Sequence, residues 1–184
     1  MQKELSSVKQ WIRKEKVLDV VVFGSSVRGK SKPGDIDLCI LISDNDEEKS
    51  LDLVDSLGKL TDKLEGDFHL SILTSSSFVK GNTLAKTLLN EGFSVKDDAP
   101  FSSVFGLSNK SLFVYSLKDF SPSKRVKFHY LLKGRYGSEG ILKEVKGKFL
   151  GTGSIIIPSS KEDLLKEVFD LWKVKYRIER ALVS

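Results

Sequence analysis

The stretch from Val20 to Ile42 constrains the fold of this chain more than any other part of its sequence. It begins with a short apolar run, Val20 to Phe23, which is rich in β-branched residues and too short for a helix. A polar loop follows, and it contains Pro33 and three basic residues. A second apolar run then continues to Ile42. The stretch therefore predicts two neighbouring buried strands joined by a polar loop.

Two carboxylates open the second strand, at Asp35 and Asp37. Side chains on a strand alternate between faces, so these two point the same way. Neighbouring carboxylates repel each other, and burying them without a partner is costly. A divalent cation relieves that repulsion, and oxygen ligands favour Mg²⁺, with Mn²⁺ as the alternative. Asp35 and Asp37 are thus candidate metal ligands.

A glycine and a serine, Gly24 and Ser25, end the first strand. Such a turn leaves backbone N–H groups free to bind a phosphate, and the glycine allows that phosphate to approach closely. An alternative interpretation is that Asp35 and Asp37 merely begin a strand at the solvent after a hairpin loop. The turn at this spacing and the apolar flanks favour a phosphate and metal site instead.

The complete pattern is an apolar residue, Gly-Ser, nine residues, then Asp-apolar-Asp-apolar. It resembles the signature of the DNA polymerase beta-like nucleotidyltransferase superfamily, and its minimal nucleotidyltransferase branch is the most similar in length. The resemblance covers about residues 18–97. It implies an α+β fold with a nucleotidyltransferase-type mixed sheet and flanking helices, and transfer of a nucleoside monophosphate from a Mg-NTP. The nucleotide-binding residues that it implies are Gly24, Ser25, Arg28, Lys30 and Lys32.

Members of this superfamily usually carry a third carboxylate on a later strand, and this chain departs from that pattern. Residues 67–74 read as that strand, and the family position falls on His69 rather than on an acid. Asp67 lies two residues earlier on the same face, roughly 6–7 Å away. His69 is therefore a candidate catalytic base, since histidine accepts protons near neutral pH. Asp67 is the alternative, as a third metal ligand, and His69 can also be an ordinary surface histidine.

Composition narrows the class of protein. No apolar run approaches the ~20 residues that cross a bilayer, and the charged N-terminus does not resemble a signal peptide. The single cysteine, Cys39, lies in the middle of a predicted strand, so it reads as a small buried hydrophobe rather than a catalytic thiol. These features favour a cytoplasmic protein, and abundant Lys and Glu beside one Met indicate a thermophilic source.

Charge divides the chain into two parts. Residues 1–100 hold 14 Lys and Arg against 17 Asp and Glu, a net of −3, whereas residues 101–184 hold 16 against 8, a net of +8. Asymmetry of this kind favours two modules with different partners. We expect a nucleotidyltransferase domain over residues 1–98, a linker at Asp97 to Pro100, and a small basic α+β domain over residues 104–184.

Periodicity and capping residues predict the remaining elements. In the first domain, helices are expected from Leu5 to Lys16, from Leu51 to about Gly66, and from Phe78 to Leu89. In the second, Ser121 and Ser138 are expected to cap helices, Ser159 and Glu162 to form a capping box, and Val174 to Val183 to form a closing strand.

Basic residues gather in the first half of the second domain. They are Lys124, Arg125, Lys127, Lys133, Arg135, Lys143, Lys146 and Lys148. Together with the aromatic ring in the loop Gly134-Arg-Tyr-Gly, they suit contact with the phosphates and an unstacked base of RNA. The alternative is an ordinary solvated basic face, and no named RNA-binding motif is present.

Two functions follow from these patterns. The first is an enzyme that transfers a nucleoside monophosphate from an NTP to a hydroxyl of RNA or of a protein. The second is a nucleotide- or nucleic-acid-binding module of the antitoxin type, with an impaired active site. The absence of an acid at His69 is the reason to keep the second.

Overall fold

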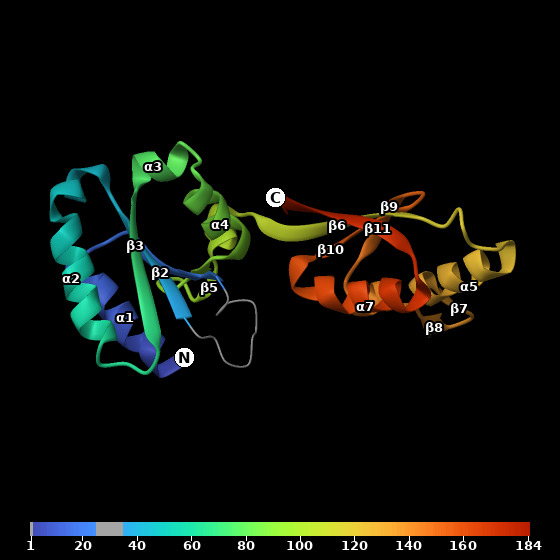
Figure 1. The fold of residues 1–184 in the computed structure, drawn as a ribbon, viewed down its shortest axis with the longest axis horizontal. Helices are drawn as coiled ribbons and strands as arrows, with labels where there is room; N and C mark the ends of the chain where they lie inside the picture. Colours follow the sequence, from blue (N-terminus) through green and yellow to red (C-terminus); the bar gives the residue numbers. More distant parts are fainter. Residues whose placement is uncertain (1, 25–34) are drawn as a thin grey trace. The chain divides into compact units, whose positions relative to one another are not determined.

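The structure is a computed structural model, and it describes residues 2–24 and 35–184 (Figure 1). The chain forms two compact units, Met1–Gly106 and Leu107–Ser184, called unit 1 and unit 2 below. No charged residue lies between positions 101 and 106, so unit 1 carries the net charge of −3 and unit 2 carries +8. Among the helices of the described residues, none has the length and apolar character that crossing a bilayer requires.

A mixed five-stranded sheet forms the centre of unit 1, with the strand order β3-β2-β1-β4-β5. Strands β2 and β3 pair in parallel, and the other neighbours are antiparallel. The strands are β1 (Asp19–Phe23), β2 (Asp35–Ile42), β3 (Asp67–Thr74), β4 (Phe93–Ser94) and β5 (Ala99–Pro100). This architecture agrees with the α+β nucleotidyltransferase-type sheet expected from the sequence.

Helices cover both faces of this sheet (Figure 1). They are α1 (Gln2–Glu15), α2 (Ser50–Thr61), α3 (Ser75–Val79) and α4 (Thr83–Glu91), with 3₁₀ turns η2 (Asp44–Lys49) and η3 (Phe101–Phe105). Leu38 and Ile40 of β2 belong to the core formed with α1 and α2. Cys39 and Leu41 belong to the core on the other face, with α4 and η3. Because β2 is buried on both faces, its sequence is a continuous apolar run rather than an alternating one.

Two expectations for unit 1 were wrong in detail. The segment from Phe78 to Leu89 is not one helix but two, because Gly81 has a φ of +72° and Asn82 caps α4 by accepting a hydrogen bond from the Ala85 N–H. The residues expected to form a linker instead belong to unit 1: Ala99–Pro100 form β5, which pairs with β4. Unit 2 begins only at Leu107, after Gly106.

Unit 2 contains a four-stranded antiparallel sheet in the order β11-β6-β10-β9. The strands are β6 (Ser108–Ser116), β9 (Lys148–Gly151), β10 (Ser154–Pro158) and β11 (Lys175–Val183), and β7 (Gly134–Arg135) pairs with β8 (Ser138–Glu139) in a separate hairpin. The helices are α5 (Pro122–Lys133), α6 (Ile141–Glu144) and α7 (Glu162–Trp172), with a 3₁₀ turn η4 (Ser159–Lys161). Apart from the hairpin and α6, the chain order is β-α-β-β-α-β, the ferredoxin-like arrangement.

Helices α5 and α7 pack on the same face of this sheet (Figure 1). Aromatic rings fill the space between: Phe113, Phe128 and Phe169 are fully buried, and Phe169 meets the other two edge to face at 5.3–5.4 Å between ring centroids. Edge-to-face contact adds to the stabilisation that burial of these rings gives. The core of unit 2 is therefore its own and is independent of the core of unit 1.

Two sequence expectations for unit 2 were wrong, and one strand was missed. Ser138 lies in strand β8, and the helix that follows is preceded by Gly140, which has no capping side chain. Strand β9 was not expected at all. Ser159 and Glu162 do not form a capping box, since Lys161 precedes α7 without a side-chain cap.

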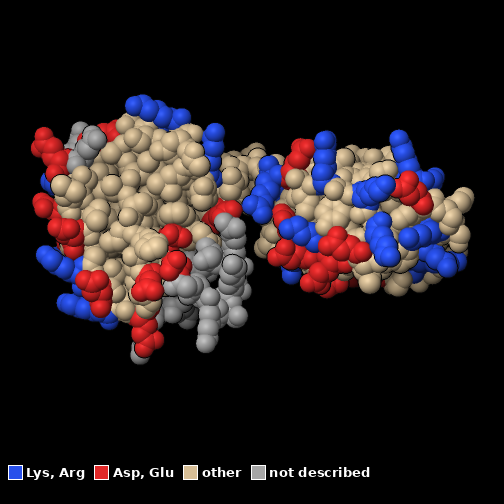
Figure 2. Space-filling model, in the orientation of Figure 1, with Lys and Arg blue, Asp and Glu red and all other residues tan. Residues whose placement is uncertain are grey.

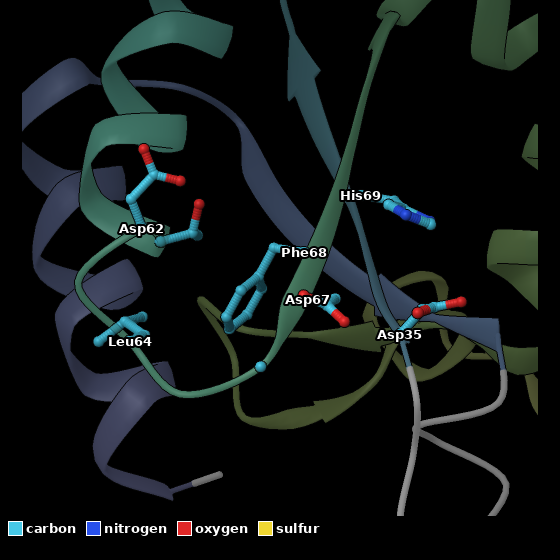
Figure 3. Close-up of a pocket in the computed structure, with 8 residues that line it drawn as sticks. Asp35, Asp62, Leu64, Asp67, Phe68 and His69 are labelled. Atoms are coloured by element: carbon cyan, nitrogen blue, oxygen red, sulfur yellow. The ribbon is translucent and has the colours of Figure 1, made fainter.

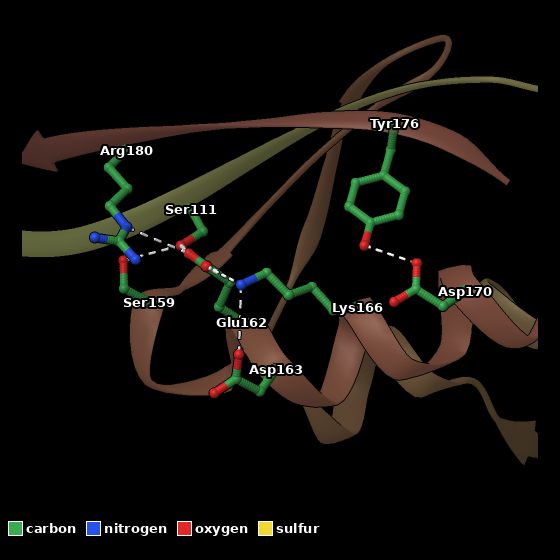
Figure 4. A network of polar contacts seen from close by, with 8 residues as sticks. All are labelled: Ser111, Ser159, Glu162, Asp163, Lys166, Asp170, Tyr176 and Arg180. Atoms are coloured by element: carbon green, nitrogen blue, oxygen red, sulfur yellow. Dashed lines mark hydrogen bonds and ion pairs between the residues drawn. The ribbon is translucent and has the colours of Figure 1, made fainter. Parts of the chain in front are cut away.

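Glu162 is buried and instead anchors a polar network that extends to the surface (Figure 4). Its carboxylate accepts a hydrogen bond from the Ser111 hydroxyl at 2.6 Å and pairs with Lys166 at 2.6 Å and Arg180 at 3.6 Å. Burial alone would raise the pKa of Glu162, but the hydrogen bonds from Lys166 and Ser111 and the two positive charges lower it below its usual range. The network joins α7 to β6 and β11, so it stabilises unit 2 while Glu162 is ionised.

We expect Glu162→Gln to lower the free energy of unfolding of unit 2 at pH 7 by about 1.5–3 kcal/mol, the range for hydrogen bonds to a charged group. Because the folded-state pKa of Glu162 is depressed, this contribution is present above the unfolded-state pKa of about 4.3 and is lost as the pH falls through the folded-state value. Denaturant unfolding can be followed by Trp172 fluorescence in a Trp11→Phe background. A difference between the proteins with and without Glu162→Gln that stays constant down to acidic pH would contradict this account.

Candidate functional site

Four polar side chains come together where strands β2 and β3 begin. In the parallel register, Asp35 is paired with Asp67 and Asp37 with His69. Their odd-numbered positions place all four on the face that carries Cys39 and Leu41, because side chains alternate along each strand. Neighbouring strands lie about 4.8 Å apart, so the pairs are direct neighbours. The structure thus brings together the four residues that the sequence singled out on these strands.

Helix α4 and η3 pack over this face at Cys39 and Leu41 but leave the strand starts exposed. An open pocket of about 440 Å³ lies at the start of β3 and reaches the opposite face of the sheet, where Phe68 and the end of α2 line it (Figure 3). Asp35, Asp67 and His69 contribute from the strands. Figure 3 shows Asp67 beside Asp35, whereas Asp62 lies apart at the end of α2. A polar, solvent-open end of a buried sheet is a suitable place for a charged ligand.

His69 faces a carboxylate without bonding to it closely. Its Nδ1 lies 3.7 Å from Oδ1 of Asp37, beyond a normal hydrogen bond. The side chain of His69 is 65% exposed and that of Asp37 is 32% exposed. His69 is thus accessible to a substrate and is close enough to Asp37 for a small movement to bring them together.

Gly24 and Asp37 are in very close contact. Phe23 is paired with Asp37 in the antiparallel β1–β2 register, which brings the next residue, Gly24, against the Asp37 carboxylate. A Cβ atom at residue 24 would lie 2.2 Å from Oδ2 of Asp37, and Gly24 has a φ of +78°. The sequence led us to expect that Gly24 leaves room here for a phosphate. In the structure, the group that occupies this space is the Asp37 carboxylate.

Four of the residues expected to bind nucleotide fall outside the described residues: Ser25, Arg28, Lys30 and Lys32. Their role stays a prediction. Gly24 is therefore the part of the expected phosphate-binding turn that can be placed.

The donor atoms of the carboxylates suit one kind of metal site. Within residues 2–24 and 35–184, no group of three or more His, Cys, Asp or Glu side chains is arranged to hold an ion. Mg²⁺, however, is commonly bound by only one or two carboxylates together with substrate phosphates and water. Asp35 and Asp37, hard oxygen donors on one face, fit that kind of site, and Asp67 lies next to Asp35.

Cys39 lies two residues beyond Asp37 on the same face, yet it is fully buried. Burial raises the pKa of its thiol to about 11. The thiol therefore stays protonated near neutral pH and cannot serve as a nucleophile. The expectation that Cys39 is a small buried side chain agrees with its position.

Sequence reasoning missed part of the pocket. Thr61 and Asp62, at the end of α2, and Leu64 and Gly66, in the following turn, line it beside β3. They lie far from residues 20–42 in the sequence, and only the packing of α2 against β3 brings them to the site. No local motif distinguishes them from ordinary helix-terminal residues.

The basic residues expected to bind nucleic acid fall into two groups. Lys124 and Arg125 serve the fold: the Lys124 ammonium donates to the Trp172 carbonyl and lies over the Phe120 ring, and the Arg125 guanidinium donates to the carbonyls of Leu117, Lys118 and Phe120. The other six are exposed to solvent, and Lys143 among them pairs with Glu139. The remaining five are Lys127, Lys133, Arg135, Lys146 and Lys148.

Comparison with known proteins identifies the first half of the chain. The family model for polymerase beta, nucleotidyltransferase, matches residues 6–96. Those residues include every strand of the sheet that carries Asp35, Asp37, Asp67 and His69 except β5. A comparison with curated proteins gave no match.

Two solved structures are similar to the chain. One is the crystal structure of a toxin–antitoxin with AMP-PNP, with 25% identity over 54% of this chain and 82% of that chain, and a TM-score of 0.38. The other is a tri-AMPylated HEPN toxin from Shewanella oneidensis in complex with MNT antitoxin, with 24% identity over 57% of this chain and 86% of that chain, and a TM-score of 0.36. Together, the motif, the sheet and the family match lead to one conclusion: residues 6–96 of this chain are a nucleotidyltransferase domain of the polymerase beta family.

Proposed function

We propose that unit 1 transfers a nucleoside monophosphate from a Mg-NTP to a hydroxyl group of an RNA or protein acceptor. The observation that carries this proposal is the contact between Gly24 and the Asp37 carboxylate, with Asp35 on the same face. It supports a site in which the turn after β1 and the two aspartates of β2 act together, as the nucleotidyltransferase motif implies.

In this proposal, Asp35 and Asp37 hold the metal ion, and the residues after Gly24, including Ser25, Arg28, Lys30 and Lys32, bind the phosphates. When bound, Mg²⁺ (or Mn²⁺) supplies positive charge that offsets the charge developing on the phosphates. The acceptor oxygen forms a bond to the α-phosphorus in line with the bond that breaks, and pyrophosphate leaves. His69 or Asp67 takes the hydroxyl proton, because both lie on the open face beside the aspartates.

The direct test is incubation of the protein with each α-³²P-labelled NTP, MgCl₂ or MnCl₂, and separate pools of RNA and protein acceptors. We expect label to appear in one acceptor pool and to require the divalent ion. Pyrophosphate release measured in parallel would confirm that the α-phosphate is the group transferred. Labelling that is unaffected by EDTA would contradict the roles of Asp35 and Asp37.

A pair of variants identifies the proton acceptor. If His69 is the base, we expect His69→Gln to lower the transfer rate by about 10²–10⁴-fold, the usual contribution of general-base catalysis, with little change in NTP affinity. Asp67→Asn would then have a smaller effect, because Asp67, which is paired with Asp35, would take no part in the proton transfer. The opposite order of effects would assign the proton to Asp67.

The second candidate function is an antitoxin-like module that binds nucleotide or nucleic acid without turnover. It is favoured by the histidine opposite Asp37, where a third carboxylate is the family pattern. Isothermal titration with Mg-NTP separates the two. Binding without any labelled product in any acceptor pool would favour this module, whereas product formation would exclude it.

A further inference from the structure

Tyr136 is the most exposed large hydrophobic side chain in the described part of the chain, at 91%. It lies at the tip of the hairpin formed by β7 and β8, in which Arg135 is paired with Ser138. An aromatic ring of this size is normally buried at least in part, because burial stabilises the fold. Neither core of unit 1 nor the core of unit 2 includes Tyr136.

The backbone at this tip makes the choice of tyrosine costly. The two central residues of the turn, Tyr136 and Gly137, have φ values of +44° and +85°. Two-residue turns with positive φ at both positions favour Asn-Gly or Asp-Gly, and a bulky side chain is disfavoured at the first of them. The fold alone would be better served by asparagine at residue 136. A tyrosine here therefore calls for an explanation outside the stability of the hairpin.

The hairpin holds this ring in a defined place. A Cβ atom at Gly134 would lie 2.1 Å from the Ser138 carbonyl oxygen, and one at Gly140 would lie 2.3 Å from the Leu132 carbonyl oxygen. The backbone at both glycines is therefore tightly packed against its neighbours. The Ser138 hydroxyl donates to the Arg135 carbonyl at 2.6 Å. Tyr136 is thus presented on a well-packed turn next to the end of α5.

A second tyrosine and an arginine continue the surface. The Arg135 guanidinium carbon lies 4.9 Å from the ring centroid of Tyr130 and 4.8 Å from that of Tyr136, within the range of cation–π contacts. Tyr130 is 40% exposed on α5. Helical spacing places Lys127 and Lys133 on the same side of α5 as Tyr130, three residues before and after it. We call Lys127, Tyr130, Lys133, Arg135 and Tyr136 the tyrosine–arginine surface.

The two lysines of this surface have no partners of their own. The side chains of Lys127 and Lys133 are exposed and make no hydrogen bond or ion pair with the described residues. Unit 2 as a whole has a net charge of +8, and Figure 2 shows Lys and Arg spread over its visible face, with acidic groups gathered in part of it. Such a surface attracts a polyanion. A protein partner is less favoured, because lysine is depleted from the centres of protein interfaces.

We propose that the tyrosine–arginine surface binds single-stranded nucleic acid. A base stacks on the exposed Tyr136 ring, and the backbone phosphates contact Lys127, Lys133 and Arg135. Single strands are favoured over duplexes because only an unpaired, unstacked base offers its flat face to a ring. This proposal concerns unit 2 alone, so it does not rest on the transfer activity proposed for unit 1.

Fluorescence anisotropy with the full chain and fluorescein-labelled oligonucleotides tests it. The probes are an RNA strand, the DNA strand of the same sequence, and the duplex of each. We expect both single strands to bind more tightly than the duplexes, and a preference for RNA over DNA would report contacts to the 2′-hydroxyl. Three phosphate contacts predict a slope of about −2 in a plot of log K against log salt concentration.

One substitution separates function from stability. Tyr136→Asn removes the ring and places the preferred residue in the turn, so we expect an unchanged or raised thermal unfolding midpoint of unit 2. We expect the affinity for single strands to fall roughly five- to a hundredfold, the value of one base stack. Leu171→Gln is the control: Leu171 is 80% exposed on α7, and its loss should leave the affinity unchanged.

Three results would overturn the proposal. They are an affinity that Tyr136→Asn leaves unchanged, equal binding of single strands and duplexes, and the absence of binding to every probe. The last would point instead to a protein as the partner of this surface.

Discussion

Asp35→Asn should abolish nucleotidyl transfer while leaving unit 1 folded. The substitution removes a negative charge from a pair that faces the open end of the sheet, and it removes no apolar contact, since Asp35 is exposed. An amide oxygen is a poorer ligand for Mg²⁺ than a carboxylate. If metal-bound phosphates carry the charge of the transition state, several kcal/mol of stabilisation are lost, which is a rate decrease of about 10³-fold or more.

The measurement is transfer of label from α-³²P-NTP, with far-ultraviolet circular dichroism and thermal unfolding as checks of the fold. Asp52→Asn is the matched control, because Asp52 is another exposed aspartate of unit 1, on α2 and outside the pocket lining. We expect the control to retain full activity. Labelling that survives Asp35→Asn would remove the metal-binding role from this residue, and titration of Mg²⁺ would show whether its binding survives as well.

Gly24→Ala should damage the same site by a different route. The new Cβ would lie 2.2 Å from Oδ2 of Asp37, so the carboxylate or the turn must move. The positive φ of Gly24 adds strain of about 1–2 kcal/mol. Displacement of a catalytic group by about 1 Å can cost about 10²-fold in rate, so we expect a fall in activity of at least that size.

Gly81→Ala separates the two effects of this change. Gly81 has nearly the same φ, +72°, but nothing lies within 4 Å of the position its Cβ would take. Gly81→Ala should lose only the free energy of unfolding that the backbone strain costs, measured by urea denaturation, whereas Gly24→Ala should lose at least as much and should also lose activity. Equal activities of the two variants would show that the contact between Gly24 and Asp37 is not needed for the site.

The sequence was sufficient to identify unit 1 because its signals are local. Apolar runs, a Gly-Ser break and alternating aspartates each depend on a few adjacent residues, and they predicted strands β1 and β2 together with the same-face placement of Asp35 and Asp37. The family match over residues 6–96 agrees with that interpretation.

Where the local signals conflicted, the sequence alone misled. The segment from Phe78 to Leu89 was expected to form one helix, but Gly81 ends the first of two, because its left-handed backbone conformation is open to glycine and is followed by a capping asparagine. Ser159 and Glu162 have the spacing of a capping box. The Glu162 carboxylate nevertheless binds Ser111, Lys166 and Arg180. It is buried between α7 and strands β6 and β11, and a buried carboxylate is stabilised by such partners.

Taken by itself, the sequence determined the pairing of a glycine turn with two aspartates, the presence of a histidine near them, and the basic charge of the second half. The placement of the two aspartates follows from the sequence because side chains two residues apart on a strand point the same way. The basic charge follows from composition alone. The tertiary structure alone decided that Asp67 faces Asp35 and His69 faces Asp37, that the Asp37 carboxylate fills the space beside Gly24, and that Arg135 contacts two tyrosine rings. Most of these contacts join segments distant in the chain, and their geometry depends on the strand register and on the packing of helices, which no single segment encodes.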